Sequence, residues 1–354
     1  MAASERSPLL QEQDSRGGTV DYTPDEDIAE PTINVSRRTF ARNLGALDGF
    51  ALLVSIVIGS GVFSSPGPID ANVPTPGASL LIWLLGGVVA WTGALTMAEL
   101  GTAIPGEGGL QPYLSYIYGD LWGYMAAWSW IVATMPATLA ILSIVFVESI
   151  YSSMGINEPS PPITHKLLSL LVLVCVTTLN SISTKTSTRL SGFFVAVKLL
   201  TILLLIVAGL VAVFVYIGKG KDLGGGDWHS KGWFTPRDTP LPDGSHFDWS
   251  GVTTWQSLGL YSTALYGALW AYSGWDKVCT PILQATMLTD WKANYVAAEL
   301  RNPSRQLPLS INTAIPTIVL CYLAANAVYY VLLPWEVVST TDAAAVVRLL
   351  HIWY

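Results

Sequence analysis

The chain has 354 residues, of which 51% are hydrophobic and only 12% are charged, and its formal net charge is −7 at pH 7. The mean hydropathy is +0.46. A chain with so much apolar surface and so few charges is not an ordinary water-soluble domain, so the composition indicates an integral membrane protein.

The first 42 residues are rich in Ser, Pro, Asp, Glu and Arg. Such a segment cannot bury enough apolar surface to offset its ordering entropy, so we expect residues 1–42 to form a disordered tail. Twelve of the 18 Lys and Arg residues fall in this tail or in later segments predicted on the same side of the membrane, which predicts a cytoplasmic N-terminus. The stretch ERSPLL, residues 5–10, resembles an acidic dileucine sorting signal of vacuolar and lysosomal membrane proteins, although a plain disordered tail is the alternative. The predicted location is the plasma membrane or the vacuolar membrane.

Beyond the tail, seven apolar stretches are long enough to cross a hydrocarbon core, which takes about 20 helical residues. Because lipid offers the backbone no hydrogen-bond partner, these stretches are expected to be helices, and the predicted fold class is an all-α multi-pass bundle. The seven stretches are residues 43–64, 79–103, 121–151, 164–182, 190–217, 252–275 and 308–333.

The first stretch is interrupted by Gly59, Ser60 and Gly61. Non-helical backbone within a membrane is tolerated only where it faces a cavity or the protein interior. An unwound segment frees amide N–H groups and carbonyl oxygens close to one another, and this pair of poles suits a zwitterion. The alternative is that the small residues only allow two helices to pack closely.

A second interruption is predicted in the sixth stretch, where Ser273 and Gly274 follow Trp270 and Tyr272. Two broken helices in one bundle are typical of a transporter site near the membrane midplane. Close helix packing is again the alternative for the glycine alone.

Five separated segments carry a resemblance to a known family. They are SIVIGSGVF (55–63), AELGTAIPGEGGLQPYLSYIYG (98–119), TRLSGFFVAVKLLTILLL (188–205), LWAYSGWDK (269–277) and NYVAAELRNPSRQLPLSI (294–311). In order and spacing the chain resembles the amino acid-polyamine-organocation (APC) superfamily. Within it the chain resembles the L-type amino acid transporter (LAT) family and its fungal methionine-permease relatives. The resemblance implies a LeuT-like inverted-repeat bundle with helices 1 and 6 unwound.

The resemblance also implies domain limits. Residues 43–333 match an amino acid permease domain, whereas relatives typically have twelve spans. We therefore expect a truncated sequence that lacks helices 8 to 12, with residues 334–354 as a C-terminal remnant. The implied function is transport of L-amino acids by alternating access, with methionine or another large neutral amino acid favoured. The alternative is a non-transporting fragment or membrane sensor that associates with full-length permeases; an ion channel would need rings of polar groups along a pore.

Roles can be carried over residue by residue from the resemblance. The backbone of Ser60 and Gly61, beside Gly59, matches the positions that hold a substrate carboxylate, and the Val57 carbonyl matches one that accepts from the ammonium group. In the sixth stretch, Trp270 matches the aromatic residue that gates the pocket. The carbonyls of Trp270 and Ala271 and the Ser273 position match those that complete the amine site.

Lys198 is a cation within the fifth stretch, where a charge is costly unless it is paired or hydrated. In relatives of this kind a lysine here lies where sodium-coupled members bind a cation, so Lys198 is a candidate for coupling or gating. The coupling mode is predicted to be proton symport or exchange. The alternative is that the side chain snorkels to the cytoplasmic interface.

Residues 278–292 separate two motifs that lie close together in relatives, so the segment is predicted to be an atypical insertion. Removing it restores the family spacing, GWDKANYV. We consider a retained intron, with an ordinary loop insertion as the alternative, because loops accept added length at little entropic cost.

The sequence predicts no enzyme site, no cofactor and no metal site. His165, His229, His246 and His351 have no ligand-like spacing, and Cys279 has no histidine base nearby. The predicted partners are an L-amino acid substrate and the lipid bilayer, with no nucleic acid. Because residues 152–165 contain no cysteine, we do not expect the disulfide-linked heavy chain of animal relatives. The run LGGG, residues 223–226, predicts a flexible loop.

Overall fold

The computed structural model describes residues 46–104, 110–154, 162–182, 184–240, 246–274 and 303–340. All of them belong to one unit of the chain, residues 40–354. The predicted tail, the insertion at 278–292, Cys279 and His351 lie outside the described residues.

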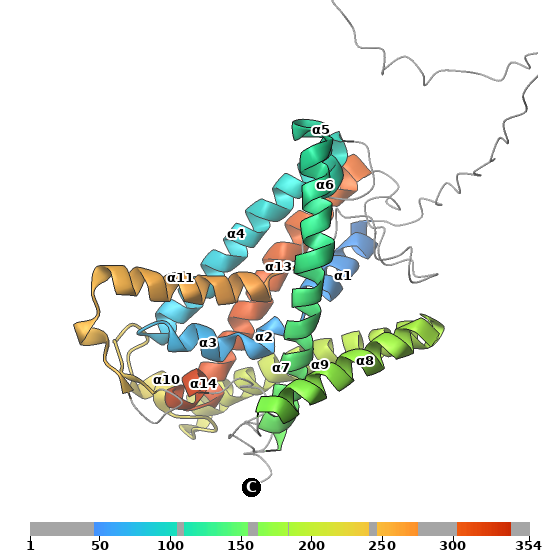
Figure 1. Ribbon diagram of the computed structural model, residues 1–354. Coiled ribbons are helices and arrows are strands. Elements are labelled where there is room, and N and C mark those ends of the chain that lie inside the picture. The colour runs from blue at the N-terminus through green and yellow to red at the C-terminus, as the bar shows by residue number, and fades with distance from the viewer. Residues whose placement is uncertain are drawn as a thin grey trace, which may run out of the picture. The chain divides into compact units, whose positions relative to one another are not determined.

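The described residues are mostly helical (Figure 1). The helices before α8 are α1 (Ala46–Val57), α2 (Gly61–Ser64), α3 (Pro66–Ala71), α4 (Pro76–Ala103), α5 (Leu110–Tyr118), α6 (Asp120–Ser129), the π-helical segment η2 (Trp130–Thr134) and α7 (Met135–Ser153). The others are α8 (Pro162–Ile182), α9 (Thr184–Lys219), α10 (Asp227–Ser230), the 3₁₀ segment η3 (Trp249–Gly251), α11 (Thr254–Ala271), α13 (Pro303–Leu332) and α14 (Trp335–Thr340).

Each of the seven predicted apolar stretches falls on one or more of these helices. Among the described residues, four helical segments are long and apolar enough to cross a membrane: Pro76–Gly101, Asp120–Tyr151, Gly192–Lys219 and Arg305–Leu332. The chain is therefore an all-α integral membrane protein, and within the same ranges the strands are limited to a two-residue antiparallel pair, β1 (Thr239–Pro240) with β2 (His246–Phe247).

The helix boundaries follow local capping chemistry. Thr75 accepts a hydrogen bond from the Ala78 amide at the start of α4, where Pro76 occupies the first helical position. Thr253 and Gln256 form a reciprocal capping box at the start of α11. These caps fix where two apolar helices, α4 and α11, begin.

The predicted interruption of the first stretch is present in the structure. Helix α1 ends at Val57, residues 58–60 form bends, and α2 begins at Gly61. The non-helical backbone therefore runs one residue earlier than predicted, because Gly61 is already the first residue of α2. In the sixth stretch, α11 ends at Ala271 and a turn follows at residues 272–274.

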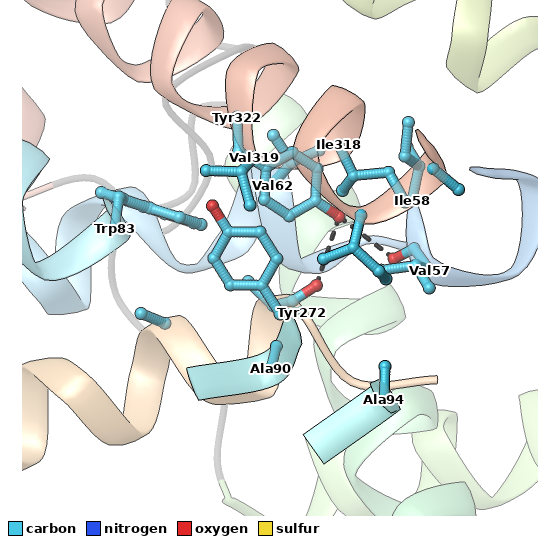
Figure 2. Packing of buried hydrophobic residues seen from close by; sticks show 14 of the residues in the cluster. Val57, Ile58, Val62, Trp83, Ala90, Ala94, Tyr272, Ile318, Val319 and Tyr322 are labelled. Atoms are coloured by element: carbon cyan, nitrogen blue, oxygen red, sulfur yellow. Dashed lines mark hydrogen bonds between the residues drawn. The ribbon is translucent and has the colours of Figure 1, made fainter. Parts of the chain in front are cut away.

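Helix α13 lies at the centre of the contacts that hold the two interruptions. It packs against α1, α4 and α9, and α11 packs against α4. Small residues permit this close packing: a Cβ added to Gly86 on α4 would lie 2.8 Å from the Ala268 Cβ on α11. The main buried cluster includes side chains from α1, α4, α11 and α13, and Figure 2 shows part of it.

The segment between α9 and α11 contacts the end of α13, and residues 223–226 form a loop, as predicted. The Gly225 amide donates to the Val331 carbonyl at 3.3 Å, and the Gly224 amide donates to the Asp222 carboxylate at 2.8 Å. Gly226 has a φ of +74°, a conformation that glycine adopts easily. The glycines thus let the backbone lie directly against the end of α13, where any side chain would clash.

Candidate functional site

The two interruptions lie against each other. A Cβ added to Gly61 would lie 2.5 Å from the Ala271 Cα, closer than real Cβ atoms approach other atoms. Gly274, with a φ of +111°, has the backbone and side chain of Ile56 beside it. Glycine is therefore needed at position 61 for the end of α11 to meet the start of α2.

A tyrosine on α13 joins the helix ends at the two interruptions. The Tyr322 hydroxyl lies 3.1 Å from the Val57 carbonyl oxygen and 3.2 Å from the Ala271 carbonyl oxygen (Figure 2, dashed lines). Val57 is the last residue of α1 and Ala271 is the last residue of α11. The final carbonyls of a helix have no partner inside it, so both oxygens are available for such a contact.

Of the three carbonyls expected at the amine site, the structure brings two together. Val57 and Ala271 converge on Tyr322, whereas the Trp270 carbonyl accepts a hydrogen bond from the Ser273 amide at 3.1 Å. The Trp270 oxygen is thus already used by the turn that ends α11.

At the first interruption, the Ser60 carbonyl has hydrogen-bond partners, whereas the amides of residues 60–62 have none among the described residues. The Ser60 carbonyl accepts from the amides of Phe63 and Ser64 at 2.9 and 3.1 Å. Within the described ranges, no hydrogen bond uses the amides of Ser60, Gly61 or Val62. This segment therefore presents donors without acceptors, next to the pair of convergent carbonyls.

The side chains expected at the site differ in burial. Ser60 and Ser273 are exposed, Gly59 and Trp270 are half-buried, and Val57 is buried. The two serine side chains thus lie at the surface of the described bundle, while the backbone groups between them are covered.

Lys198 contacts the first interrupted helix from α9. Its Nζ donates to the Ser55 carbonyl at 2.6 Å, and the side chain is partly buried. Ser55 lies in the last turn of α1, where carbonyls lack helical partners and the helix dipole favours a cation. Lys198 therefore caps the C-terminal end of α1, two residues before the Val57 carbonyl.

No metal centre is found in the part of the chain that the structure describes, since no group of three or more His, Cys, Asp and Glu side chains is placed to hold an ion there. His229 lies 3.0 Å from the Asp222 carboxylate and stacks on Tyr216, while His165 stacks on Tyr151. These histidines belong to separate local contacts.

Sequence reasoning missed Tyr322, together with a buried charged cluster made of Asp70, Arg237 and Tyr330. The Asp70 carboxylate is fully buried, pairs with the Arg237 guanidinium and accepts from the Tyr330 hydroxyl. A tyrosine within an apolar span is a usable signal, because its hydroxyl needs a partner when it is buried. Which partner it finds depends on the packing of distant helices.

The long apolar helices, the break between α1 and α2 and the end of α11 that lies against it define a helical integral membrane protein. Comparison with known families gives the assignment: the amino acid permease family model matches residues 44–351. The chain belongs to the amino acid permease family. The predicted membership of the APC superfamily is therefore confirmed, and this family consists of permeases rather than enzymes.

Similar proteins come from the L-type branch of the superfamily. The b(0,+)-type amino acid transporter 1 of Mus musculus is 31% identical over 304 residues, covering 86% of this chain and 54% of that protein. The Asc-type amino acid transporter 1 of Mus musculus is 28% identical over 310 residues, covering 88% and 51%. The large neutral amino acids transporter small subunit 2 of the same organism is 27% identical over 309 residues, covering 86% and 50%. The chain spans about half the length of these relatives.

Proposed function

We propose that this protein transports L-amino acids across a membrane by alternating access, on a LeuT-like inverted-repeat fold. Support comes from the family and from the names of the relatives, which are amino acid transporters. We propose neutral amino acids, including methionine, as substrates. The side chains that surround the interruptions in Figure 2 are largely apolar, and they include Val57, Ile58, Val62, Ile318 and Val319.

The observation that carries this proposal is the pairing of opposite backbone poles. The carbonyls of Val57 and Ala271 converge, and the amides of Ser60 and Gly61 are free of acceptors in the described ranges. An amino acid carries an ammonium group and a carboxylate on neighbouring atoms, so one molecule can satisfy both poles. In this proposal the amides of Ser60 and Gly61 receive the carboxylate, beside Gly59, whose amide bonds to the Tyr322 hydroxyl.

The amine site completes the proposal. The Val57 and Ala271 carbonyls receive the ammonium group, with Ser273 at the rim of the site. Trp270, half-buried at the end of α11, covers the pocket. Lys198 bonds to Ser55 on the same helix as Val57. In this proposal it couples substrate transport to the driving ion, either by carrying a proton or by taking the place of a metal cation.

The test is binding and uptake by the chain reconstituted in lipid. Labelled L-methionine and L-leucine are measured with lipid nanodiscs for binding and with vesicles for uptake. Saturable uptake supports transport, binding without uptake favours a sensor or a non-transporting fragment, and ion current without saturable uptake favours a channel.

Gly61→Leu is the sharpest variant for the site, because a leucine side chain would fill the space between Gly61 and Ala271. We expect loss of methionine binding. Gly259→Ala on α11 is the matched control, since a Cβ there meets no atom within 4 Å. Unchanged affinity in a folded Gly61→Leu protein would refute the assignment of the site.

A further inference from the structure

Tyr322 has one hydroxyl hydrogen between two carbonyl acceptors. Its distances to the Val57 and Ala271 oxygens are 3.1 and 3.2 Å, both longer than the 2.7–2.8 Å that is usual for a hydroxyl donor. Each carbonyl oxygen has two lone pairs, so the hydroxyl leaves most of their acceptor capacity unused. The two oxygens can thus take further N–H donors while they remain bonded to Tyr322.

The position of this hydroxyl is set by the bundle and not by the interruptions themselves. The Tyr322 side chain is 0% exposed. Its ring centroid lies 5.7 Å from that of Trp83 on α4, at right angles, and 4.8 Å from that of Tyr272. Because close-packed interiors permit little movement, the ring presents its hydroxyl at a fixed point between the ends of α1 and α11.

Building on the proposed function, we propose that Tyr322 is a positioning residue for the substrate ammonium group. Its hydroxyl holds the Val57 and Ala271 carbonyls together so that both face one primary ammonium group, and it thereby couples the two interrupted helices to α13. The ammonium group supplies three N–H donors, so it can donate to both carbonyls and keep one donor for another acceptor.

The ligand class follows from this geometry. A compound with an ammonium group can donate to both carbonyls at once, whereas an α-hydroxy acid with the same side chain has one O–H donor at that position. The paired carbonyls therefore discriminate between the two compounds, and Tyr322 contributes to that selectivity because it maintains the pairing.

The experiment compares the unmodified chain with Tyr322→Phe, which removes only the hydroxyl. Binding of labelled L-methionine is measured in lipid nanodiscs, with the α-hydroxy acid analogue of methionine as competitor. We expect Tyr322→Phe to weaken methionine binding about tenfold, since one hydrogen bond that organises the site is lost. The analogue should be affected less, so the selectivity ratio falls.

Tyr329→Phe is the matched control, because Tyr329 lies on the same helix and is 1% exposed. Its hydroxyl has no hydrogen-bond partner in the described part of the chain. We expect the selectivity of this variant to equal that of the unmodified protein. A purely structural defect in a folded Tyr322→Phe protein would weaken both compounds equally, and this result overturns the positioning role.

The outcomes separate this inference from the proposed function. If the unmodified chain binds methionine and Tyr322→Phe has the same selectivity, the inference is wrong and the proposed function stands. If the unmodified chain binds neither labelled L-methionine nor labelled L-leucine, the proposed function fails and this inference fails with it.

A second measurement applies if Tyr322→Phe does not fold. Amide hydrogen exchange of the unmodified chain is followed as L-methionine is added. Residues 58–62 and 272–274 should gain protection with the same half-saturating concentration, because one ammonium group engages both helix ends. Protection of only one of these segments overturns the proposal.

Discussion

Two tyrosines of α13 contact the N-terminal helices, Tyr322 at the end of α1 and Tyr330 on α3, and they do so in different electrostatic settings. Tyr322 donates to the Val57 carbonyl, while Tyr330 donates to the Asp70 carboxylate. They lie eight residues apart, about 12 Å along the helix, and both are almost completely buried. One helix thus contacts the end of α1 and the short helix α3 through two hydroxyl groups.

The region around Tyr330 is held by charge. Asp70 pairs with Arg237, whose guanidinium also lies 5.7 Å from the centre of the Trp335 ring. The Arg237 amide donates to the Pro74 carbonyl, so the loop backbone is fixed as well. Removing a member of such a cluster leaves a buried charge unpaired, so this region acts as an anchor.

The region around Tyr322 contains neutral backbone groups: the Val57 and Ala271 carbonyls share the hydroxyl hydrogen, and the Gly59 amide bonds to the hydroxyl oxygen. A ligand can enter such an arrangement without leaving a buried charge unpaired. The comparison teaches that these two contacts of α13 have different tasks. The contact at Asp70 keeps its partners, and the contact at Val57 can exchange them.

The largest expected effect tests the anchor. Asp70→Asn keeps the size of the side chain but leaves Arg237 without its counter-charge, so the free energy of unfolding should fall by roughly 3–5 kcal/mol. Unfolding of the detergent-solubilised protein by SDS measures this change. Lys231→Ala is the control, because Lys231 is half exposed and pairs with Asp227 at the surface. It should cost less than about 1 kcal/mol, and equal losses in the two variants would contradict the anchor.

Tyr330→Phe sharpens the contrast between the two tyrosines. It removes the hydroxyl that donates to the Asp70 carboxylate, and hydrogen bonds to charged groups contribute about 1.5–3 kcal/mol. We expect a loss of stability in this range, with no change in the selectivity for methionine over its α-hydroxy analogue. A change in selectivity as large as that of Tyr322→Phe would remove the distinction between the two regions.

Lys198→Met tests whether the C-terminal end of α1, at Val57, also depends on a cation. The variant keeps the chain length and loses the bond to the Ser55 carbonyl, together with the charge at the C-terminal end of α1. We expect a loss of about 1 kcal/mol in stability. Vesicle uptake measured over a series of pH values should also change, and an unchanged pH profile would leave Lys198 with the structural contact alone.

The smallest effect is expected at Asp222, in the loop before α10. Burial acts to raise the pKa of Asp222, but hydrogen bonds from the Gly224 amide and from His229 outweigh it, so its pKa lies below the usual 3.8. Because its pKa is lowered on folding, the ionised Asp222 carboxylate stabilises the folded protein above pH 3.8. This stabilisation is lost as the pH falls through the folded-state pKa.

Asp222→Asn should therefore lower stability by about 0.5 kcal/mol near neutral pH. The difference from the unmodified protein should shrink in acid, and SDS unfolding at several pH values measures it. A difference that grows as the pH falls would show that the sign is wrong.

The candidate site was only partly predictable from the sequence. The first interruption was predicted from Gly59, Ser60 and Gly61, because small residues within an apolar stretch weaken a helix. The sequence also predicted an interruption at Ser273 and Gly274, and α11 ends just before them, at Ala271. Tyr322 escaped notice, since nothing local distinguishes it from the other tyrosines of α13.

By itself, the sequence determined the apolar stretches, the positions at which helices break and the family, because these depend on local composition and on motif order. Only the tertiary structure decided which polar groups meet. Val57 and Tyr322 are 265 residues apart, and Asp70 and Tyr330 are 260 residues apart. Such contacts arise because a buried hydroxyl must find an acceptor among whatever backbone and side chains the helix packing brings to it.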